Sequence, residues 1–346
     1  MIKVVHIDAG QEWRGGQKQV FLLHKGLLEK GIESFLVCNH HGELYQQAHE
    51  HVANCMGWNY SGKRSFGTKK DLETILQHIQ PDIIHFHDSL SLNYSKVGVG
   101  IKIETRRVSY PVKWISRITK YKGIQHHVGV SQTITNYLLR FFKSCSTIHS
   151  SIDLAYYTNS TNQTVLKNKS EYNILFVGAY SKQKGIDVLI EAFAELIQSG
   201  AEATLHLCGS GELQTQLDTQ IAKNEISNYV VQYGHQKDIA PFYQEADVVI
   251  VPSVDGEGSS GTIKEGIASL KPVIASDIEP NKELIDHGKT GFLFKSGNSQ
   301  KLMKLLAKKP SIPIAVLEEK RLEFSSEIMV NKYEQLYHQL INSSKN

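Results

Sequence analysis

Two glutamates, Glu257 and Glu265, stand eight positions apart in a stretch that is rich in Gly and Ser. The stretch follows an apolar, β-branched run at 246–251, which predicts a buried parallel strand. A helix is expected to begin near Gly261. Free N–H groups and the positive end of the helix dipole would then converge on one anion. The residues expected around that anion are Gly258, Ser259, Ser260, Gly261 and Thr262.

The two carboxylates need partners other than phosphate, because like charges repel each other. Hydroxyl groups are the natural partners, since a carboxylate accepts hydrogen bonds from them. A ligand with phosphates in the middle and polyols at both ends would use the whole stretch, and a nucleotide sugar has that form. The alternative for Glu257 is an ordinary loop acid that caps the helix.

Helices and strands alternate along the chain. An apolar strand is expected at 2–7, a helix at 17–30, and further strands at 34–38 and 81–87. This alternation predicts a doubly wound parallel sheet, whose ligands bind at the carboxyl ends of the strands. Gly15, Gly16 and His87 lie at such ends. A polar stretch at 157–170 predicts a linker, and a second α/β domain is expected from residue 172 onward.

The composition bounds the class of protein. A length of 346 residues suits two domains, and a net charge of +3 is too small to argue for nucleic acid. The four cysteines are widely spaced, which suggests neither a zinc site nor a disulfide framework. The chain opens on an apolar strand without a signal-peptide pattern, and no apolar run reaches membrane-spanning length. We therefore expect a cytoplasmic protein.

Several short motifs occur in one order along the chain. They are the Glu-x7-Glu pair with Lys-Pro-Val-Ile-Ala-Ser at 271–276, Gly15-Gly16, Val177-Gly178 with Lys184-Gly185, Gly209-Ser210-Gly211, and 281–293. Together they resemble the signature of the family 4 retaining glycosyltransferases. The resemblance implies an α/β GT-B fold, with two Rossmann-like doubly wound domains facing a central cleft. It implies an acceptor domain at 1–155, a donor domain at 170–325 and a helix at 326–346 that crosses back.

The resemblance also implies an activity: retaining transfer of a sugar from a nucleoside diphosphate sugar to an acceptor hydroxyl. The expected donor is a UDP-sugar, and the expected acceptor is a glycan or lipid-linked glycan in surface polysaccharide assembly. Glu257 would contact the transferred sugar as a catalytic residue, and Glu265 would contact the ribose. The other donor contacts would be Gly15, Gly16, Gly178, Lys184 and the Gly258–Thr262 loop.

Ala179 stands where the family commonly has Arg, so a second cation for the diphosphate must come from elsewhere. Lys182, Arg106 and Arg107 are the candidates. No cofactor is expected beyond the nucleotide sugar as co-substrate. No Asp-x-Asp motif occurs, so no metal is expected either, and a helix dipole with cations would stabilise the leaving diphosphate.

His87 is a further candidate catalytic residue, because the family places a His near the acceptor in this domain. The next strand segment, 104–108, carries no His, which leaves Arg106 and Arg107 as alternative ligands for an anionic acceptor. His85 and His87 are two positions apart on a strand and share one face. No third metal ligand is apparent beside them, so we favour a structural pair.

A basic and aromatic stretch at 102–122 carries one acid, Glu104. It is interpreted as a solvated helix face or as a surface that rests on anionic membrane lipid. Two other functions stay open for the chain as a whole: a nucleotide-sugar epimerase of the same GT-B fold, and a non-catalytic nucleotide-sugar-binding protein.

Overall fold

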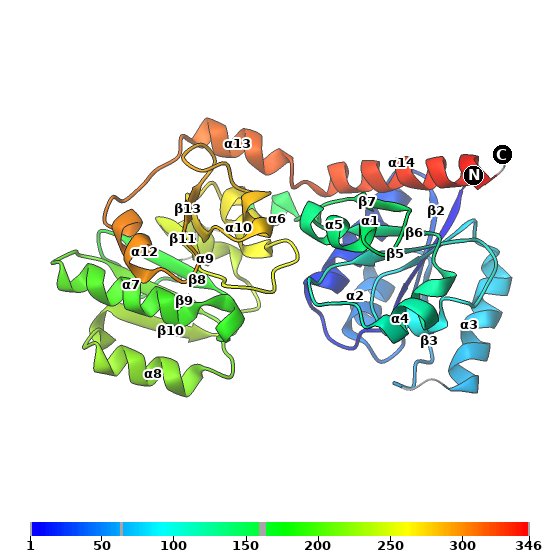
Figure 1. Cartoon of the computed structure of the whole chain (residues 1–346), viewed down its shortest axis with the longest axis horizontal. Helices are drawn as coiled ribbons and strands as arrows, with labels where there is room; N and C mark the ends of the chain where they lie inside the picture. Colours follow the sequence, from blue (N-terminus) through cyan, green and yellow to red (C-terminus); the bar gives the residue numbers. More distant parts are fainter. Residues whose placement is uncertain (1, 63–64, 159–163, 345–346) are drawn as a thin grey trace. The chain divides into compact units, whose positions relative to one another are not determined.

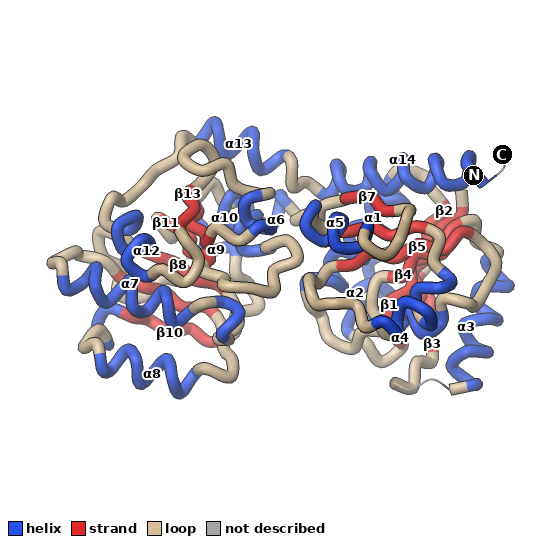
Figure 2. The backbone as a smooth tube through the Cα atoms, in the orientation of Figure 1, coloured by secondary structure: helices blue, strands red, loops and turns tan. Residues whose placement is uncertain are grey.

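The structure is a computed structural model that describes residues 2–62, 65–158 and 164–344. The chain divides into two compact units. Unit 1 comprises Met1–Ser151 and Ser325–Asn346, and unit 2 comprises Ile152–Phe324. Each unit contains one parallel β-sheet (Figures 1 and 2).

The sheet of unit 1 has seven strands in the order β3-β2-β1-β4-β5-β6-β7. The strands are β1 (Lys3–Asp8), β2 (Glu33–Asn39), β3 (Cys55–Trp58), β4 (Ile83–Phe86), β5 (Ile101–Arg106), β6 (His126–Gly129) and β7 (Cys145–Thr147). The α-helices are α1 (Gly15–Glu29), α2 (Glu43–His51), α3 (Phe66–Ile79), α4 (Trp114–Thr119), α5 (Gln132–Leu139) and α14 (Ser326–Ser344).

Alternate residues of these strands pack on opposite faces of the sheet. Val4 and Ile83 belong to a core with α1 and α14, whereas Val5 and Ile84 belong to a core with α3. Close packing of α14 on α1 depends on Gly26, because a Cβ atom there would lie 2.5 Å from a methyl group of Val330. The final helix is therefore part of the core of unit 1.

The sheet of unit 2 has six strands in the order β10-β9-β8-β11-β12-β13. The strands are β8 (Asn173–Val177), β9 (Thr204–Cys208), β10 (Val230–Gly234), β11 (Val248–Val251), β12 (Val273–Ser276) and β13 (Phe292–Phe294). The α-helices are α6 (Leu154–Thr158), α7 (Ile186–Gln198), α8 (Gln214–Lys223), α9 (Ala240–Glu245), α10 (Gly261–Ala268), α11 (Glu279–Lys282), α12 (Ser299–Leu306) and α13 (Ile314–Leu322).

Helices cover both faces of this sheet as well. One core joins the strands to α7, α8 and α12, and the other joins them to α6, α9, α10 and α13. The inner strands β11 and β12 are almost continuously apolar, as expected of parallel strands that are buried on both faces. In both units the strand order reverses next to the first strand, so the prediction of doubly wound parallel sheets is confirmed.

The predicted linker at 157–170 differs from the structure. Residues 159–163 lie outside the described residues, but the flanking parts of the stretch pack within unit 2. Tyr157 and Leu166 are buried in its core, and the N–H groups of Val165 and Leu166 donate to Glu245. The stretch was predicted to be a linker because most of its residues are polar. Its buried apolar residues, such as Tyr157 and Leu166, are too widely spaced to form a pattern.

No helix in the described part of the chain combines the length and hydropathy that crossing a bilayer requires.

Candidate functional site

The sheet of unit 2 reverses its strand order between β8 and β11, which lie side by side. Loops that leave two such strands diverge, and the crevice between them is where open α/β sheets bind ligands. Gly178 follows β8 and leads into a 3-10 turn, Lys182–Lys184. The loop with Glu257 follows β11 and leads into α10, which begins at Gly261 as predicted. Two predicted motifs therefore meet at one edge of the sheet.

Glu257 is buried in its loop, with 7% of its surface exposed. One carboxylate oxygen accepts a hydrogen bond from Ser253 Oγ at 2.7 Å and another from Lys184 Nζ at 2.6 Å. Ser253 is itself held from behind, because Ser276 Oγ donates to its carbonyl oxygen and Asn281 Nδ2 donates to Ser276. Glu257 thus sits in a fixed geometry next to a cation.

Gly185 brings Lys184 to this position. It has a left-handed conformation, with φ of 62°, and a Cβ atom there would lie 2.2 Å from the carbonyl oxygen of Pro252. The backbone of the β8–α7 loop can therefore touch the backbone of the β11–α10 loop only at a glycine. The Val254 N–H donates to the Gln183 carbonyl and joins the same two loops. Lys182, in the same turn, is exposed.

The hydroxyl groups of the Gly258–Thr262 loop form hydrogen bonds with other groups of the protein. Ser260 Oγ caps α10 by accepting from the Ile263 N–H at 3.5 Å, and Thr262 Oγ1 donates to the Val177 carbonyl at 3.3 Å. Ser259 Oγ accepts from Lys264 Nζ at 2.7 Å. Backbone N–H groups of the first helical turn have no acceptor within the helix, so they are the groups of this loop suited to an anion.

Glu265 lies one turn into α10, half-buried, with two tyrosine partners. Tyr243 Oη donates to its carboxylate at 2.7 Å, and Tyr157 also forms a hydrogen bond to it. Burial, together with the Glu265 charge, raises the pKa of both tyrosines, so both phenols stay protonated as donors. Glu265 also lines a cavity of about 350 Å³ with Val177, Gly178, Ala179, Cys208, Gly209, Ser210, His235, Gln236 and Ile239.

His87 in unit 1 is buried, whereas a catalytic base must be accessible to the substrate. It is 4% exposed, and both ring nitrogens have partners. Arg107 donates to His87 Nδ1 at 3.2 Å and to the His87 carbonyl oxygen at 3.0 Å, while His87 Nε2 lies 2.9 Å from His6 Nδ1. Burial lowers the pKa of His87 well below its usual value, with help from His85 and Arg107.

These contacts fix the ring tautomers. A guanidinium only donates, so His87 Nδ1 must accept, and the proton of the neutral ring is on Nε2. His87 Nε2 then donates to His6 Nδ1, which leaves the His6 proton on Nε2. That nitrogen is buried and has no hydrogen-bond partner among the described residues. Arg107, His87 and His6 therefore form one directed chain of hydrogen bonds.

His6 is also the third candidate metal ligand that the sequence analysis did not find. Nitrogens of His6, His85 and His87 lie within 4.8 Å of one another, so a third histidine stands beside the pair that the sequence predicted. β1 and β4 are neighbours with His6 and His85 in register, which no sequence spacing could reveal. Hydrogen bonds between His85 and the hydroxyl groups of Tyr337 and Thr105 already engage both of its ring nitrogens. The adjacent Arg107 charge disfavours a cation there.

Of the other predicted residues of unit 1, Arg107 lies near Gly15 and Gly16, whereas Arg106 points away from them. Gly15 and Gly16 open α1, and a Cβ atom on Gly16 would lie 3.7 Å from Arg107 Cδ, so Arg107 and this helix terminus are close. Arg106 points elsewhere, since it donates to Tyr121 Oη and to the Tyr110 carbonyl. Gly10, Gln17 and Asp88 help to line a nearby cavity of about 420 Å³.

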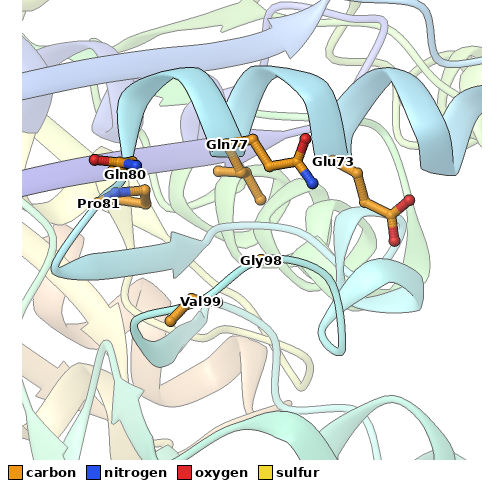
Figure 3. Close-up of a pocket in the computed structure, with 7 residues that line it drawn as sticks. Glu73, Gln77, Gln80, Pro81, Gly98 and Val99 are labelled. Carbon is orange, nitrogen blue, oxygen red and sulfur yellow. The ribbon is translucent and has the colours of Figure 1, made fainter.

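Figure 3 shows another cavity of unit 1. Its lining includes Glu73 and Gln77 of α3, with Pro81, Gly98 and Val99 just before β4 and β5. Pro81 and Val99 precede their strands, so this cavity lies at the amino ends of the sheet. Ligands of doubly wound folds bind at the opposite edge.

Comparison with known proteins gives the family. The model described as "Glycosyltransferase Family 4" matches residues 13–156, and the one described as "Glycosyl transferases group 1" matches residues 159–322. The two matches together cover most of the chain. The chain belongs to the family 4-type GT-B glycosyltransferases.

Relatives of this glycosyltransferase include an uncharacterized glycosyltransferase of Methanocaldococcus jannaschii, 32% identical over 42% of this chain and 40% of the relative. The amylovoran biosynthesis glycosyltransferase AmsK of Erwinia amylovora is 34% identical over 38% of this chain and 34% of the relative. The matched part thus spans less than half the length of these two curated relatives.

Solved structures share the fold of this glycosyltransferase over nearly its full length. A glycosyltransferase from Rickettsia africae has a TM-score of 0.83 at 20% identity and covers 98% of each chain. The HepE protein of Anabaena, solved in complex with UDP, has a TM-score of 0.80 at 16% identity and covers 98% of this chain and 100% of its own.

Sequence reasoning missed several residues that support the site: Tyr157, Tyr243, Ser253, Lys264 and Asn281. Asn281 stands in the 281–293 motif, and Ser253 and Lys264 stand beside the predicted loop, but none of the three was named as a site residue. Tyr157 of α6 and Tyr243 of α9 contact Glu265 from other elements. Such contacts depend on tertiary packing, and the sequence carried no signal for them.

Proposed function

We propose that this glycosyltransferase moves a sugar, with retention of configuration, from a UDP-sugar to an acceptor hydroxyl in polysaccharide or lipid-linked glycan synthesis. One observation carries the proposal. The carboxylates of Glu257 and Glu265 flank a Gly- and Ser-rich loop that opens a helix at the switch point of unit 2. The backbone N–H groups that would bind a diphosphate therefore lie between two carboxylates that would accept hydrogen bonds from hydroxyl groups.

The donor would take over contacts that the protein now makes with itself. The diphosphate binds at the N-terminus of α10 and attracts Lys184, which gives up its 2.6 Å contact with Glu257. Glu257 then accepts from hydroxyl groups of the transferred sugar, and Glu265 accepts from the ribose. Negative charge develops on the leaving diphosphate, where Lys184 and the helix terminus stabilise it.

A second cation is needed because Ala179 replaces the usual Arg. In unit 1, Arg107 is the best candidate, since it adjoins Gly16 at the start of α1. His87 would act through Arg107 as a positioning residue, because its Nδ1 accepts from the guanidinium. Direct proton transfer by His87 stays a prediction. Arg106 and Lys182 are the other candidates, of which Arg106 donates to Tyr121 Oη and Lys182 is exposed. We propose that no metal or cofactor takes part.

A lipid-linked acceptor would suit a surface on unit 1. None of the residues of α4 is buried, and Trp114, Ile115 and Ile118 expose 65%, 57% and 54% of their surfaces. Lys113 and Lys122 flank them and are exposed, and no acid occurs from 105 to 122. Exposed apolar side chains among cations fit the interface of an anionic membrane. We propose that the protein is cytoplasmic and binds there peripherally.

Sedimentation with phosphatidylglycerol vesicles tests this surface. We expect the wild type to bind at low salt, and a variant with Trp114→Ser, Ile115→Ser and Ile118→Ser to stay in the supernatant. Ile314→Ser is the matched control, because Ile314 is 61% exposed but lies in unit 2. Equal sedimentation of all three proteins would contradict the proposed surface.

Turnover of UDP-sugars tests the reaction itself. Purified protein is incubated with a panel of UDP-sugars, and NMR reads the anomeric configuration of released or transferred sugar. We expect one donor to be consumed with retention and Glu257→Gln to lose at least a hundredfold in rate. A product with inverted configuration would overturn the retaining assignment. Interconversion of two UDP-sugars would favour the epimerase, and binding without turnover would favour the non-catalytic protein.

A further inference from the structure

Lys264 is a fully buried lysine on the helix that carries Glu265. Its exposed surface is 0%, although lysines are rarely buried unless they are paired. The ammonium group reaches the Gly258–Thr262 loop, where Nζ donates to Ser259 Oγ at 2.7 Å. A buried charge therefore lies directly behind the loop whose backbone faces the proposed diphosphate.

Several elements of unit 2 surround this ammonium. Nζ lies 5.9 Å from the centre of the Phe324 ring, and Lys320 Nζ of α13 lies 5.7 Å from the same ring. The charges of Glu265 on α10 and Glu283 next to α11 attract the ammonium. Burial outweighs them and lowers the pKa of Lys264 to about 7. The lysine is thus poised between charged and neutral forms near neutral pH.

A purely structural role would account for a buried lysine that anchors a helix. It does not account for the direction of the side chain, which ends on a residue of the phosphate-binding loop. Without a contribution from Lys264, the proposed donor site would take its positive charge in unit 2 from Lys184, which pairs with Glu257 at 2.6 Å when no donor is bound, and from the exposed Lys182. A charge in a low-dielectric interior acts more strongly than one in water.

Resting on the proposed function, we propose that Lys264 is a positioning residue and the buried cation of the donor site. Its ammonium orients Ser259 and supplies positive charge behind the loop, and a bound diphosphate keeps it protonated. Binding of the donor is then coupled to uptake of a proton. The affinity for the donor falls as the pH rises above the pKa of Lys264, because the neutral lysine must first gain its proton.

Calorimetric titration with UDP-glucose between pH 6.5 and 8.5 tests this coupling. The diphosphate of UDP-glucose does not titrate in this range, so any pH dependence belongs to the protein. We expect the affinity of the wild type to fall roughly tenfold across the range. Lys264→Arg should bind with little pH dependence, since arginine stays charged. Lys264→Met should bind weakly at every pH.

The control is Lys271→Met, which removes a lysine of the same unit whose pKa burial also lowers but which lies beyond the end of α10. It should keep the wild-type pH dependence, and circular dichroism confirms that each variant folds. Identical pH profiles for wild type, Lys264→Arg and Lys264→Met would overturn the role of Lys264 and leave the donor site intact. Absence of any binding of UDP-glucose or UDP by the wild type would overturn the proposed function as well.

Discussion

Glu265 depends on two phenols that come from separate helices. Tyr157 and Tyr243 are both buried, and their pKa values are raised, so each phenol keeps its proton and donates a hydrogen bond to the carboxylate. These hydrogen bonds hold the carboxylate on the wall of the cavity, where the proposed function places the ribose. A hydrogen bond to a charged group contributes about 1.5–3 kcal/mol when both partners are present.

We predict that Tyr243→Phe weakens the binding of UDP several-fold, because Glu265 loses a donor and can rotate. Tyr157→Phe should have a smaller effect of the same sign. Tyr172→Phe is the matched control, since the Tyr172 hydroxyl is buried without a hydrogen-bond partner among the described residues. Its loss should leave UDP affinity unchanged and stability equal or slightly higher. Isothermal titration and urea unfolding measure both quantities, and an unchanged affinity in Tyr243→Phe would contradict this role.

The sequence predicted single residues where a residue type and its backbone setting were enough. The start of α10 at Gly261 follows from the local pattern. Glu257, Glu265 and Gly185 were named through the Glu-x7-Glu and Lys-Gly motifs, and their roles in the site stay predictions. The network of His6, His87 and Arg107 does not, because it depends on the neighbouring order of β1, β4 and β5. The contact between Glu257 and Lys184 likewise appears only when two loops meet, whereas Ser253 lies in the same loop as Glu257.

At the scale of elements, the site depends on how closely the β8–α7 and β11–α10 loops approach. Gly185 is the point of contact. We predict that Gly185→Ala lowers the free energy of unfolding by at least 2 kcal/mol and greatly reduces turnover, because the two backbones must separate.

Gly200→Ala is the matched control. Gly200 also has a positive φ, 87°, but nothing lies within 4 Å of a Cβ atom there. Its substitution should cost about 1 kcal/mol of stability and leave turnover intact. Equal losses of stability and activity in both variants would mean that left-handed backbone geometry alone matters, and that the approach of the loops does not position Lys184.

The alternation of strands and helices was predictable because buried parallel strands are continuously apolar and helices show a longer period. The described residues of the 157–170 segment pack within unit 2, and the sequence did not indicate this because their anchoring contacts come from distant residues. Glu245 accepts from the backbone of Val165 and Leu166, and Tyr233 Oη accepts from Lys167. Composition alone cannot distinguish a polar segment that is fixed in this way from one that is not.

At the scale of the whole molecule, unit 1 buries several histidines. Burial lowers the pKa of His6, His85 and His87 well below the usual value, and that of His24 and His126 to about 4. The unfolded chain binds these protons below about pH 6.5, whereas the folded unit does not. Their contribution to stability is therefore present above pH 6.5 and lost as the pH falls. Asp8 opposes them, because burial raises its pKa to about 6.

We predict that the free energy of unfolding of unit 1 falls steeply between pH 6.5 and 5. Each histidine contributes about 1.4 kcal/mol per pH unit, and Asp8 offsets roughly one of them. Urea unfolding at several pH values measures the slope and hence the number of protons taken up. A stability that is flat over this range would show that the buried histidines bind protons in the folded state.

The central claim is that unit 2 binds a nucleoside diphosphate beside Glu265. Thermal unfolding in the presence of nucleoside diphosphates tests this claim most directly. Wild type and Glu265→Ala are compared with UDP, GDP and ADP, each with and without EDTA. A ligand that binds only the folded state raises the melting temperature. The account predicts a shift of several degrees with UDP, insensitive to EDTA and lost in Glu265→Ala. An equal shift in the variant, or no shift with any diphosphate, would contradict it.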